Sequence, residues 1–296
     1  MKNIIIYQKK ELKIMECAEL FDIDITKMRE RIKRNCSENK IDWKKELKKC
    51  SLDITRAYMI EKYVFKTPLW KGQKHLLECM KHRHITFSVK SRAVGYTSLM
   101  AALTACEMTL NCDVEDINNT SYYDIVYIAQ SGQERSLFIK QVIEYINRIP
   151  KQLWTSDCNL SSTAKELCLG NSRLTTTQPD RYGFSASNSK TPKKVIYDEM
   201  VTCNNDFDFN NPYEQNWFEI SDKVIIGGCT NHNNEKFYNF AKDYKEKHGC
   251  FVKMEWDDNP YHTTYDYRLR KDYCYDMYSF ADEYDCEIYK LVKEKL

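Results

Sequence analysis

Residues 90–98 (KSRAVGYTS) have the composition and the surroundings of a loop that binds phosphate. The loop follows the β-branched and apolar run 85–89, which predicts a buried strand, and precedes the apolar run 99–103, which predicts a helix. A strand, a tight loop with a glycine and a helix that opens on a hydroxyl residue form the layout in which backbone N–H groups and a helix N-terminus hold a phosphate chain. The order of residue types therefore predicts an anion-binding loop.

Such a loop needs a turn that lets the backbone approach the anion, a cation, and a hydroxyl group for magnesium. Gly95 can supply the turn, and either Lys90 or Arg92 can supply the cation. Thr97 or Ser98 can supply the hydroxyl group. Each requirement of phosphate binding is thus met by at least one residue of the loop.

The loop departs from the usual phosphate-binding pattern G-x-x-x-x-G-K-[ST] at two positions. The first glycine is absent, and Tyr96 stands where the pattern has lysine. Taken alone, the loop therefore has two interpretations: a phosphate loop, or a solvated basic turn before a helix.

A second stretch, residues 193–200 (KKVIYDEM), predicts an apolar strand that ends in two adjacent carboxylates. In phosphate-hydrolysing enzymes of this layout the first acid, here Asp198, belongs to the magnesium shell, and the second, here Glu199, orients or deprotonates the attacking water. The alternative is a strand followed by an acidic turn. The two stretches lie about a hundred residues apart in the order that P-loop ATPases have, so together they favour an enzyme of that class.

At this point the sequence resembles the large terminase subunits of tailed bacteriophages, whose N-terminal domain is the ATPase of the DNA-packaging motor. Members commonly carry S-R-x-x-G-[K or a substitute]-[ST], and residues 91–97 (SRAVGYT) are similar to that motif. Some members lack the lysine after the glycine and have one at the front of the loop, as Lys90 stands here. The resemblance implies that this early lysine takes over the phosphate contact.

Further matches follow in the order that the family has. Residues 70–73 (WKGQ) resemble its adenine-reading glutamine motif, and a glutamine amide can both donate to and accept from an adenine edge. Residues 224–231 (VIIGGCTN) resemble the coupling motif, a strand that ends in a small polar residue sensing the γ-phosphate. Residues 280–287 (FADEYDCE) resemble the segment with which the family passes from the ATPase to the nuclease domain. The resemblance covers roughly residues 55 to 290.

The resemblance implies a role for each matched residue in the hydrolysis of ATP with Mg²⁺. Thr97 and Asp198 would bind magnesium, and Glu199 would activate the attacking water. Thr230 or Asn231 would relay the state of the γ-phosphate, and Arg92 would stabilise charge, either within the subunit or beside an arginine from a neighbour. The residues implied for nucleotide binding are Trp70, Gln73, Lys90, Ser91, Arg92, Ala93, Val94, Gly95, Tyr96, Thr97 and Ser98.

The same resemblance implies partners and a place of action. The partners would be double-stranded DNA, the portal protein and the small terminase subunit, and the motor would drive DNA into a preformed capsid in the cytoplasm of the infected host cell. The assembled motor would be a homo-oligomeric ring, while the isolated chain could be a monomer. The family's nuclease is a further domain, so no DNA cleavage is expected from this polypeptide.

Strands alternating with helices, with acids at the carboxyl ends of strands, predict an α/β fold with a mostly parallel central sheet flanked by helices. The resemblance makes this a P-loop ATPase of the ASCE type. Three parts are expected: an N-terminal helical appendage over 1–62, the ATPase core over 63–264, and a C-terminal helical segment over 265–296 that leads towards the absent nuclease domain.

Composition limits the other classes of function. The 296 residues carry a formal charge of +2, so the composition has no basic excess that would indicate binding to nucleic acid. Contact with DNA would then be confined to one face of the chain or to another domain. Charged residues make up 30% of the chain and no apolar run approaches the length of a membrane span. The 13 cysteines include no C-x-x-C pair, which indicates reduced side chains rather than a disulfide framework or a zinc site.

Two other functions remain open at the level of sequence. A helicase-like, nucleic-acid-dependent ATPase shares the glutamine motif, the phosphate loop and the Asp-Glu strand, but its second recombinase-like domain has no room here. A catalytically silent scaffold would keep the fold without the reaction, and the missing lysine at Tyr96 suggests it.

Overall fold

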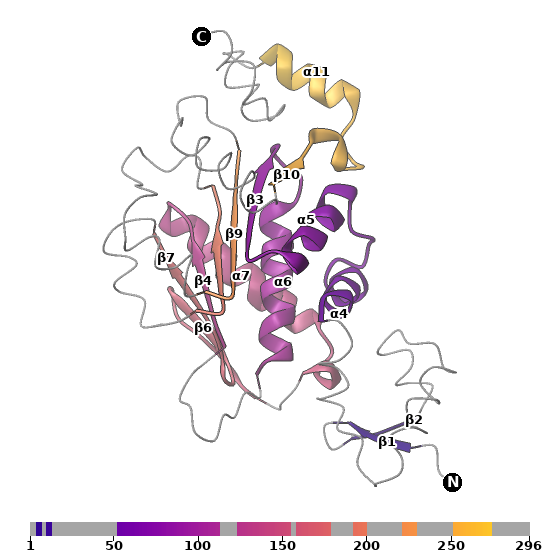
Figure 1. Ribbon diagram of the computed structural model, residues 1–296, viewed down its shortest axis with the longest axis vertical. Helices are drawn as coiled ribbons and strands as arrows, with labels where there is room; N and C mark the ends of the chain where they lie inside the picture. The colour runs from indigo at the N-terminus through magenta and orange to yellow at the C-terminus, as the bar shows by residue number, and fades with distance from the viewer. Residues whose placement is uncertain are drawn as a thin grey trace.

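The computed structural model describes residues 4–7, 10–13, 52–112, 123–154, 158–178, 192–199, 221–229 and 251–273. Figure 1 shows these residues as a sheet with helices packed beside it and a small separate hairpin near the N-terminus. The hairpin pairs β1 (Ile4–Tyr7) with β2 (Lys10–Lys13) in antiparallel register.

Eight strands of the described chain form one sheet in the order β10-β3-β9-β8-β4-β7-β6-β5. The six strands from β10 to β7 are parallel, and β6 and β5 are added at the far edge by antiparallel pairing. This confirms the predicted α/β class with a mostly parallel sheet. The bounds are β3 Ile85–Lys90, β4 Tyr123–Ile128, β5 Leu160–Ser162, β6 Glu166–Leu169, β7 Ser172–Thr177, β8 Lys194–Tyr197, β9 Lys223–Gly228 and β10 Phe251–Met254.

The strand order places the two predicted chemical stretches on the same edge of the sheet. Loop 90–98 leaves the carboxyl end of β3, and the acids follow the carboxyl end of β8. Only β9 lies between these two strands, and all three run in parallel. Because parallel strands end at one common edge, residues far apart in the sequence meet there, as ligand-binding residues do in open α/β sheets.

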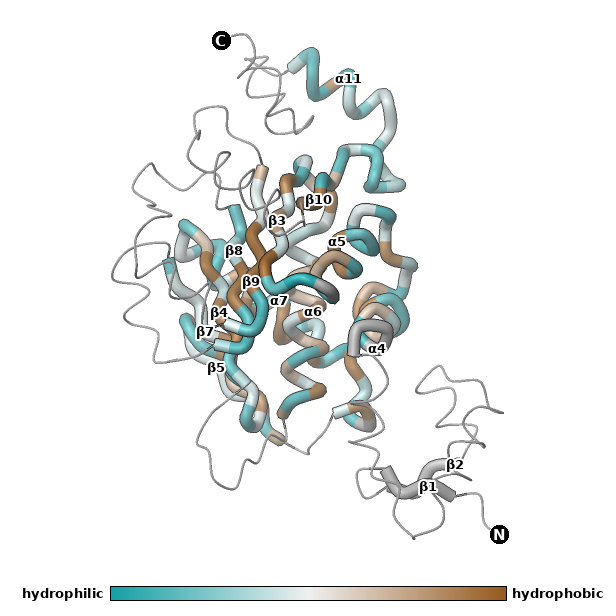
Figure 2. The backbone as a smooth tube through the Cα atoms, in the orientation of Figure 1, coloured by the Kyte–Doolittle hydropathy of each residue, from teal (hydrophilic) through white to brown (hydrophobic). Residues whose placement is uncertain are grey.

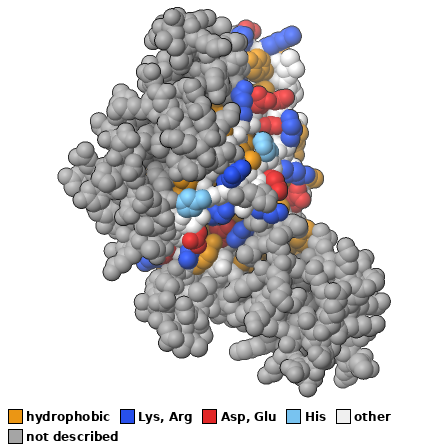
Figure 3. Space-filling view, viewed as in Figure 1, with side chains coloured by type: hydrophobic (Ala, Val, Ile, Leu, Met, Phe, Trp, Pro, Cys, Tyr) orange, Lys and Arg blue, Asp and Glu red, His pale blue; other side chains and the backbone are white. Residues whose placement is uncertain are grey.

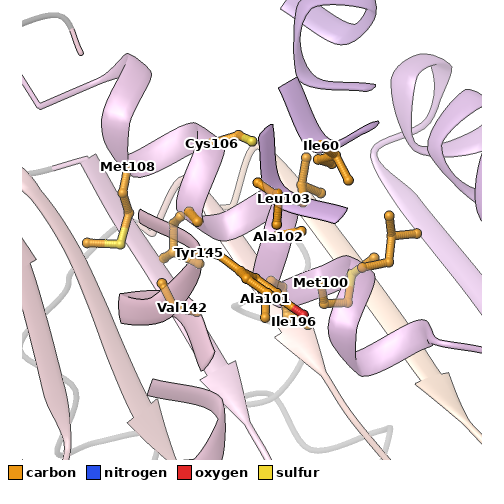
Figure 4. Close-up of a cluster of buried hydrophobic side chains, with 14 of the residues drawn as sticks. Ile60, Met100, Ala101, Ala102, Leu103, Cys106, Met108, Val142, Tyr145 and Ile196 are labelled. Carbon is orange, nitrogen blue, oxygen red and sulfur yellow. The ribbon is translucent and has the colours of Figure 1, made fainter. Parts of the chain in front are cut away.

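The helix α6 (Tyr96–Leu110) runs through the centre of the molecule and is buried along nearly its whole length. Its small residues Ala101, Ala102 and Ala105 let the sheet and the neighbouring helices approach closely, and all three are fully buried. A helix that is apolar on every side belongs in a core. Figure 4 shows α6 side chains packed against Tyr145 and Ile196, and Figure 2 shows the apolar strands beside it.

Helices α7 (Gly132–Arg148) and α5 (Lys71–His82) pack beside this central helix and the sheet. Helix α7 begins with a capping box in which Ser131 Oγ accepts from the Glu134 N–H. Helix α5 lies next to β3 and β10. No helix in the described part of the chain combines the length and the apolar composition that crossing a bilayer requires.

The expected helical appendage differs from what is observed in two ways. Lys10–Lys13 forms a strand, because the β-branched run Ile4-Ile5-Ile6 offers it a pairing partner.

At the other end of the expected appendage, α4 (Leu52–Met59) continues as the π-helix η1 (Ile60–Phe65) through the predicted boundary at residue 62. Met59, Ile60 and Val64 are buried in the core cluster, so packing on the core begins before that boundary. The division into three parts stays a prediction, since residues 14–51 and 274–296 lie outside the described residues.

A buried cluster of three charges ties α4, α6 and β8 together. Glu107 on α6 is in contact with Lys194 of β8 and lies 3.2 Å from Arg56 Nε of α4. Burial alone would raise the pKa of Glu107, but the two cations bring it below its usual value. A cavity of about 510 Å³ opens beside this cluster at the amino ends of the strands, the edge opposite to loop 90–98.

We expect Glu107→Gln to lower the free energy of unfolding by about 3 kcal/mol, because removing the carboxylate leaves the buried Lys194 and the partly buried Arg56 without their shared partner. Urea unfolding at neutral pH measures this. Glu144→Gln is the matched control, since Glu144 pairs with Arg148 on α7 but 60% of its side chain is exposed. The control should change stability by less than about 0.5 kcal/mol. Equal effects of the two variants would contradict a structural role for the buried cluster.

Candidate active site at the carboxyl edge of the sheet

Lys90 is the centre of the polar contacts at this edge. It is the last residue of β3, and its ammonium nitrogen lies 3.1 Å from Asp198 Oδ1 and 2.5 Å from Glu199 Oε1. Only 8% of its side chain is exposed. Burial alone would lower the pKa of Lys90, but the Asp198 and Glu199 carboxylates hold it above its usual value. The lysine therefore stays charged and holds both acids beside the loop.

Asp198 is fixed from two further directions. Its Oδ2 atom accepts a hydrogen bond of 2.6 Å from Thr97 Oγ1 and one of 3.0 Å from the Tyr127 hydroxyl. Tyr127 is buried on β4 and stacks on Phe138 with 3.6 Å between ring centroids. Burial and the nearby Asp198 raise the pKa of Tyr127, so its hydroxyl stays protonated and donates. Tyr127 was not expected from the sequence, because only the pairing of β4 with β8 brings it to Asp198.

The candidate hydroxyl and cationic residues of the loop lie in different surroundings. Of the two hydroxyl residues, Thr97 lies at Asp198, while Ser98 Oγ accepts from Gln141 Nε2 of α7. Of the two cations, Lys90 contacts the acids, while Arg92 is exposed on the loop.

The Thr97 hydroxyl beside the Asp198 carboxylate forms a pair of hard oxygen donors, which fits Mg²⁺. No cluster of three or more metal-binding His, Cys, Asp or Glu residues occurs among the described residues.

Tyr96 is buried against the sheet, next to Lys90 and the end of β8. Its side chain is 1% exposed, its hydroxyl donates to the Tyr197 carbonyl oxygen at 3.2 Å, and its ring lies 4.9 Å from Lys90 Nζ. A Cβ atom on Gly227 of β9 would lie 2.2 Å from this ring, so only glycine leaves room for it. Tyr96 is thus a core residue whose ring contacts Lys90, and it does not take the place of the usual lysine at the surface of the loop.

The backbone of loop 90–98 is held at three points. The Ser91 N–H donates to the Met254 carbonyl at 2.8 Å, Asn259 Nδ2 to the Ala93 carbonyl at 2.8 Å, and Gln73 Nε2 to the Gly95 carbonyl at 3.3 Å. Gly95 has φ +73° and starts α6, so its left-handed conformation turns the chain into the helix. The contact of Asn259 was not foreseen from the sequence.

Gln73 and Trp70 lie against the loop. The Gln73 side chain is 3% exposed, and besides donating to Gly95 it accepts from the Trp70 N–H at 3.1 Å. A Cβ atom on Gly95 would lie 3.1 Å from the Trp70 ring. Both ends of the Gln73 amide therefore have protein partners here, and its role in reading adenine stays a prediction.

Glu199 has an unusual backbone conformation, and its carboxylate is hydrogen-bonded to the residue that follows β9. It has φ +55°, the left-handed region that non-glycine residues rarely adopt, and its Oε2 atom accepts from the Cys229 N–H at 3.3 Å. Such conformations persist where the surroundings over-determine them, often at functional sites. The predicted coupling residues Thr230 and Asn231 follow Cys229 directly in the chain but lie outside the described residues, as does the segment 280–287.

We expect Gly227→Ala to lower the midpoint of thermal unfolding by several degrees, since the new Cβ overlaps the Tyr96 ring and overpacking costs about 1–3 kcal/mol. Gly132→Ala is the control, because a Cβ there would meet its nearest atom only at 3.6 Å. Adding Tyr96→Leu to Gly227→Ala should recover part of the loss. No recovery in the double variant would mean that the two residues are not packed as described.

Comparison with known proteins addresses the fold. No protein-family model matches the sequence, and no curated protein matches it either. The structure is similar to the large terminase ATPase domain of Thermus phage P74-26, with a TM-score of 0.57 and 15% sequence identity over 77% of this chain and 97% of that domain.

Two longer proteins are similar as well. The large terminase of bacteriophage HK97 has a TM-score of 0.53 at 15% identity over 68% of this chain and 43% of its own. A large terminase from a thermophilic bacteriophage, in complex with ADP, has a TM-score of 0.53 at 11% identity over 74% of this chain and 53% of its own. The chain thus spans about half the length of these two proteins. The resemblance read from the motifs extends to the three-dimensional structure: the chain has the fold of the ATPase domain of bacteriophage large terminases.

Proposed function

We propose that this chain is an ATPase of the large-terminase type, which hydrolyses ATP with magnesium to drive double-stranded DNA into a capsid. The observation that carries the proposal is the arrangement of Lys90, Thr97, Asp198 and Glu199 around the end of β3 and the start of α6. A cation, a hydroxyl–carboxylate pair and a second carboxylate beside a helix N-terminus are the parts that phosphoryl transfer to water requires.

Binding would use the backbone of loop 90–98 and the N-terminus of α6, where N–H groups and the helix dipole favour the β- and γ-phosphates. Lys90 would supply the cation and would exchange one of its two carboxylate partners for a phosphate oxygen. Mg²⁺ held by Thr97 and Asp198 would neutralise charge on the phosphates. Gln73 and Trp70 lie where the loop meets α5 and would contact the adenine.

Hydrolysis would use Glu199 as the group that orients the attacking water and accepts its proton. Its Oε2 atom is already aimed by the Cys229 N–H, and release of Oε1 from Lys90 would make it available to water. Asp198 would keep its orientation through Thr97 and Tyr127. Arg92, exposed on the loop, would stabilise charge on the transferred phosphoryl group, alone or beside an arginine of a neighbouring subunit.

Coupling to DNA would pass through the end of β9. Cys229 contacts Glu199, and Thr230 and Asn231 come next in the chain, so a change at the γ-phosphate would reach them within two residues. On the face drawn in Figure 3, basic and acidic side chains of the described residues are interspersed, which agrees with the formal charge of +2. Partners in the motor would be a portal protein, a small terminase subunit and further copies in a ring, in the cytoplasm of the infected cell.

The rival interpretation, a silent scaffold, rested on the missing lysine at Tyr96. Tyr96 is buried under the sheet and Lys90 reaches both acids from β3, so a charged lysine stands at the site without one at position 96. These contacts favour an active enzyme.

Glu199→Gln should retain nucleotide binding and lose most ATP turnover, because the amide keeps the size of the side chain but cannot accept the proton. We expect a decrease of at least about a hundredfold in phosphate release, measured with Mg²⁺ at high protein concentration, with and without double-stranded DNA. Glu78→Gln, on the exposed side of α5, is the control and should be unchanged. Full turnover of Glu199→Gln would remove Glu199 from the catalytic role.

Lys90→Ala should raise the dissociation constant for ATP at least about tenfold, since the site loses its buried cation and keeps two carboxylates that repel phosphate. Binding of a fluorescent ATP analogue measures this, with circular dichroism to show that the variant is folded. Lys193→Ala is the control, because Lys193 pairs with Asp222 at the opposite end of β8. Unaltered affinity and turnover in Lys90→Ala would show that another group holds the phosphates.

A further inference from the structure

The segment that connects β10 to α11 (Thr264–Tyr273) lies against loop 90–98 (Figure 1). Within it, Asn259 is 7% exposed and donates from Nδ2 to the carbonyl oxygen of Ala93 at 2.8 Å. The loop is thereby bonded at its middle to a residue more than 160 positions away in the sequence. The residue pattern of a phosphate loop does not include such a partner.

Ala93 has a backbone conformation that needs support. Its φ of +60° lies in the left-handed region, where the Cβ of an L-residue is crowded by the backbone. Such a residue holds its conformation only when surrounding contacts outweigh the strain. The carbonyl of Ala93 is the group that Asn259 holds, so this hydrogen bond opposes the relaxation of the loop to a right-handed or extended form.

Asn259 is itself fixed in one orientation. Its Oδ1 atom accepts the Tyr261 N–H at 3.0 Å, which directs Nδ2 towards Ala93. The same Nδ2 lies 3.0 Å from His262 Nε2, and His262 Nδ1 lies 2.9 Å from the Trp256 carbonyl oxygen. The His262 ring stacks on Trp256 with 3.5 Å between centroids. Asn259 is therefore a rigid donor rather than a mobile surface amide.

We propose that Asn259 is a positioning residue for nucleotide binding, because it holds Ala93 and thus loop 90–98 in the conformation that receives phosphate before the nucleotide arrives. The inference rests on the proposed function of the loop and names a residue for it outside the matched motifs. A loop ordered in advance loses less conformational entropy on binding, so the effect of Asn259 appears in affinity rather than in the chemical step.

The test compares Asn259→Asp and Asn259→Ala with Asn111→Asp. Asn111 is the matched control, since its Nδ2 donates to the Glu107 carbonyl at 2.7 Å at the far end of α6. Asn259→Asp keeps the acceptor for Tyr261 but places an oxygen against the Ala93 carbonyl. Hydrogen exchange of the loop amides is measured without nucleotide, and the dissociation constant of ADP carrying a methylanthraniloyl fluorophore is measured by titration.

Both Asn259 variants should exchange the loop amides faster and bind the fluorescent ADP about tenfold more weakly, which is the fold-change expected for one lost buried hydrogen bond. ATP turnover at saturating nucleotide should stay within about threefold, giving a rise in KM without a matching fall in kcat. The Asn111→Asp control should leave loop exchange and affinity unchanged. Equal exchange and equal affinity in all three variants would overturn the role of Asn259.

A double-mutant cycle separates positioning from general support of the connector. Ala93→Gly removes the strain of the left-handed conformation, so Asn259→Ala should weaken nucleotide binding less in that background than in the natural chain. Strictly additive effects would overturn the link through Ala93. Absence of nucleotide binding by the unsubstituted chain would remove the proposed function itself, whereas binding that is indifferent to Asn259 would remove only this inference.

Discussion

A buried ammonium group held between two carboxylates is the constraint on which the candidate site depends. Lys90, Asp198 and Glu199 come from strands that are not neighbours, so their contact requires β9 between them and a common edge for all three strands. Taking a lysine out of water is costly unless its charge is matched, and a single carboxylate partner with imperfect geometry does not compensate fully. The second carboxylate explains why a lysine that is almost fully buried keeps its charge.

The position of Tyr96 follows from this constraint. In the proposed site the cation comes from β3, so the residue after Gly95 would not have to reach the phosphates, and its side chain packs against the sheet. Gly227 is the counterpart of that change, because any larger residue on β9 would occupy the space of the ring. The aromatic residue in the loop and the glycine on a central strand therefore form one packed pair, in which neither can change size without the other.

Sequence reasoning succeeded where the signal was local. The apolar runs that became β3, β8 and α6 and the loop between β3 and α6 were predicted from residue patterns, and the strand β9 followed from the family resemblance. What the sequence did not contain was the spatial order of the strands, and the missed residues depend on it. Tyr127 reaches Asp198 only because β4 pairs with β8, and Asn259 reaches Ala93 only because β10 pairs with β3. The helix expected at Lys10–Lys13 is a strand for the same reason, since this segment is extended because it pairs with Ile4–Tyr7 and its own composition does not indicate a strand.

The charge balance of the site indicates why its parts are needed together. One lysine and two carboxylates leave a net charge of −1 at the place where the highly charged phosphates of a nucleotide would sit. The backbone N–H groups and the dipole of α6 offset only part of that repulsion, each interaction being worth about 0.3–1 kcal/mol when exposed. If a nucleotide binds here as proposed, Lys90 would have to turn from a carboxylate to a phosphate, and a divalent cation on the Thr97–Asp198 pair would have to supply the remaining positive charge. Release of Glu199 and binding of the phosphates would thus be the same event, because Lys90, which restrains the carboxylate in this structure, is the group that the phosphate would attract.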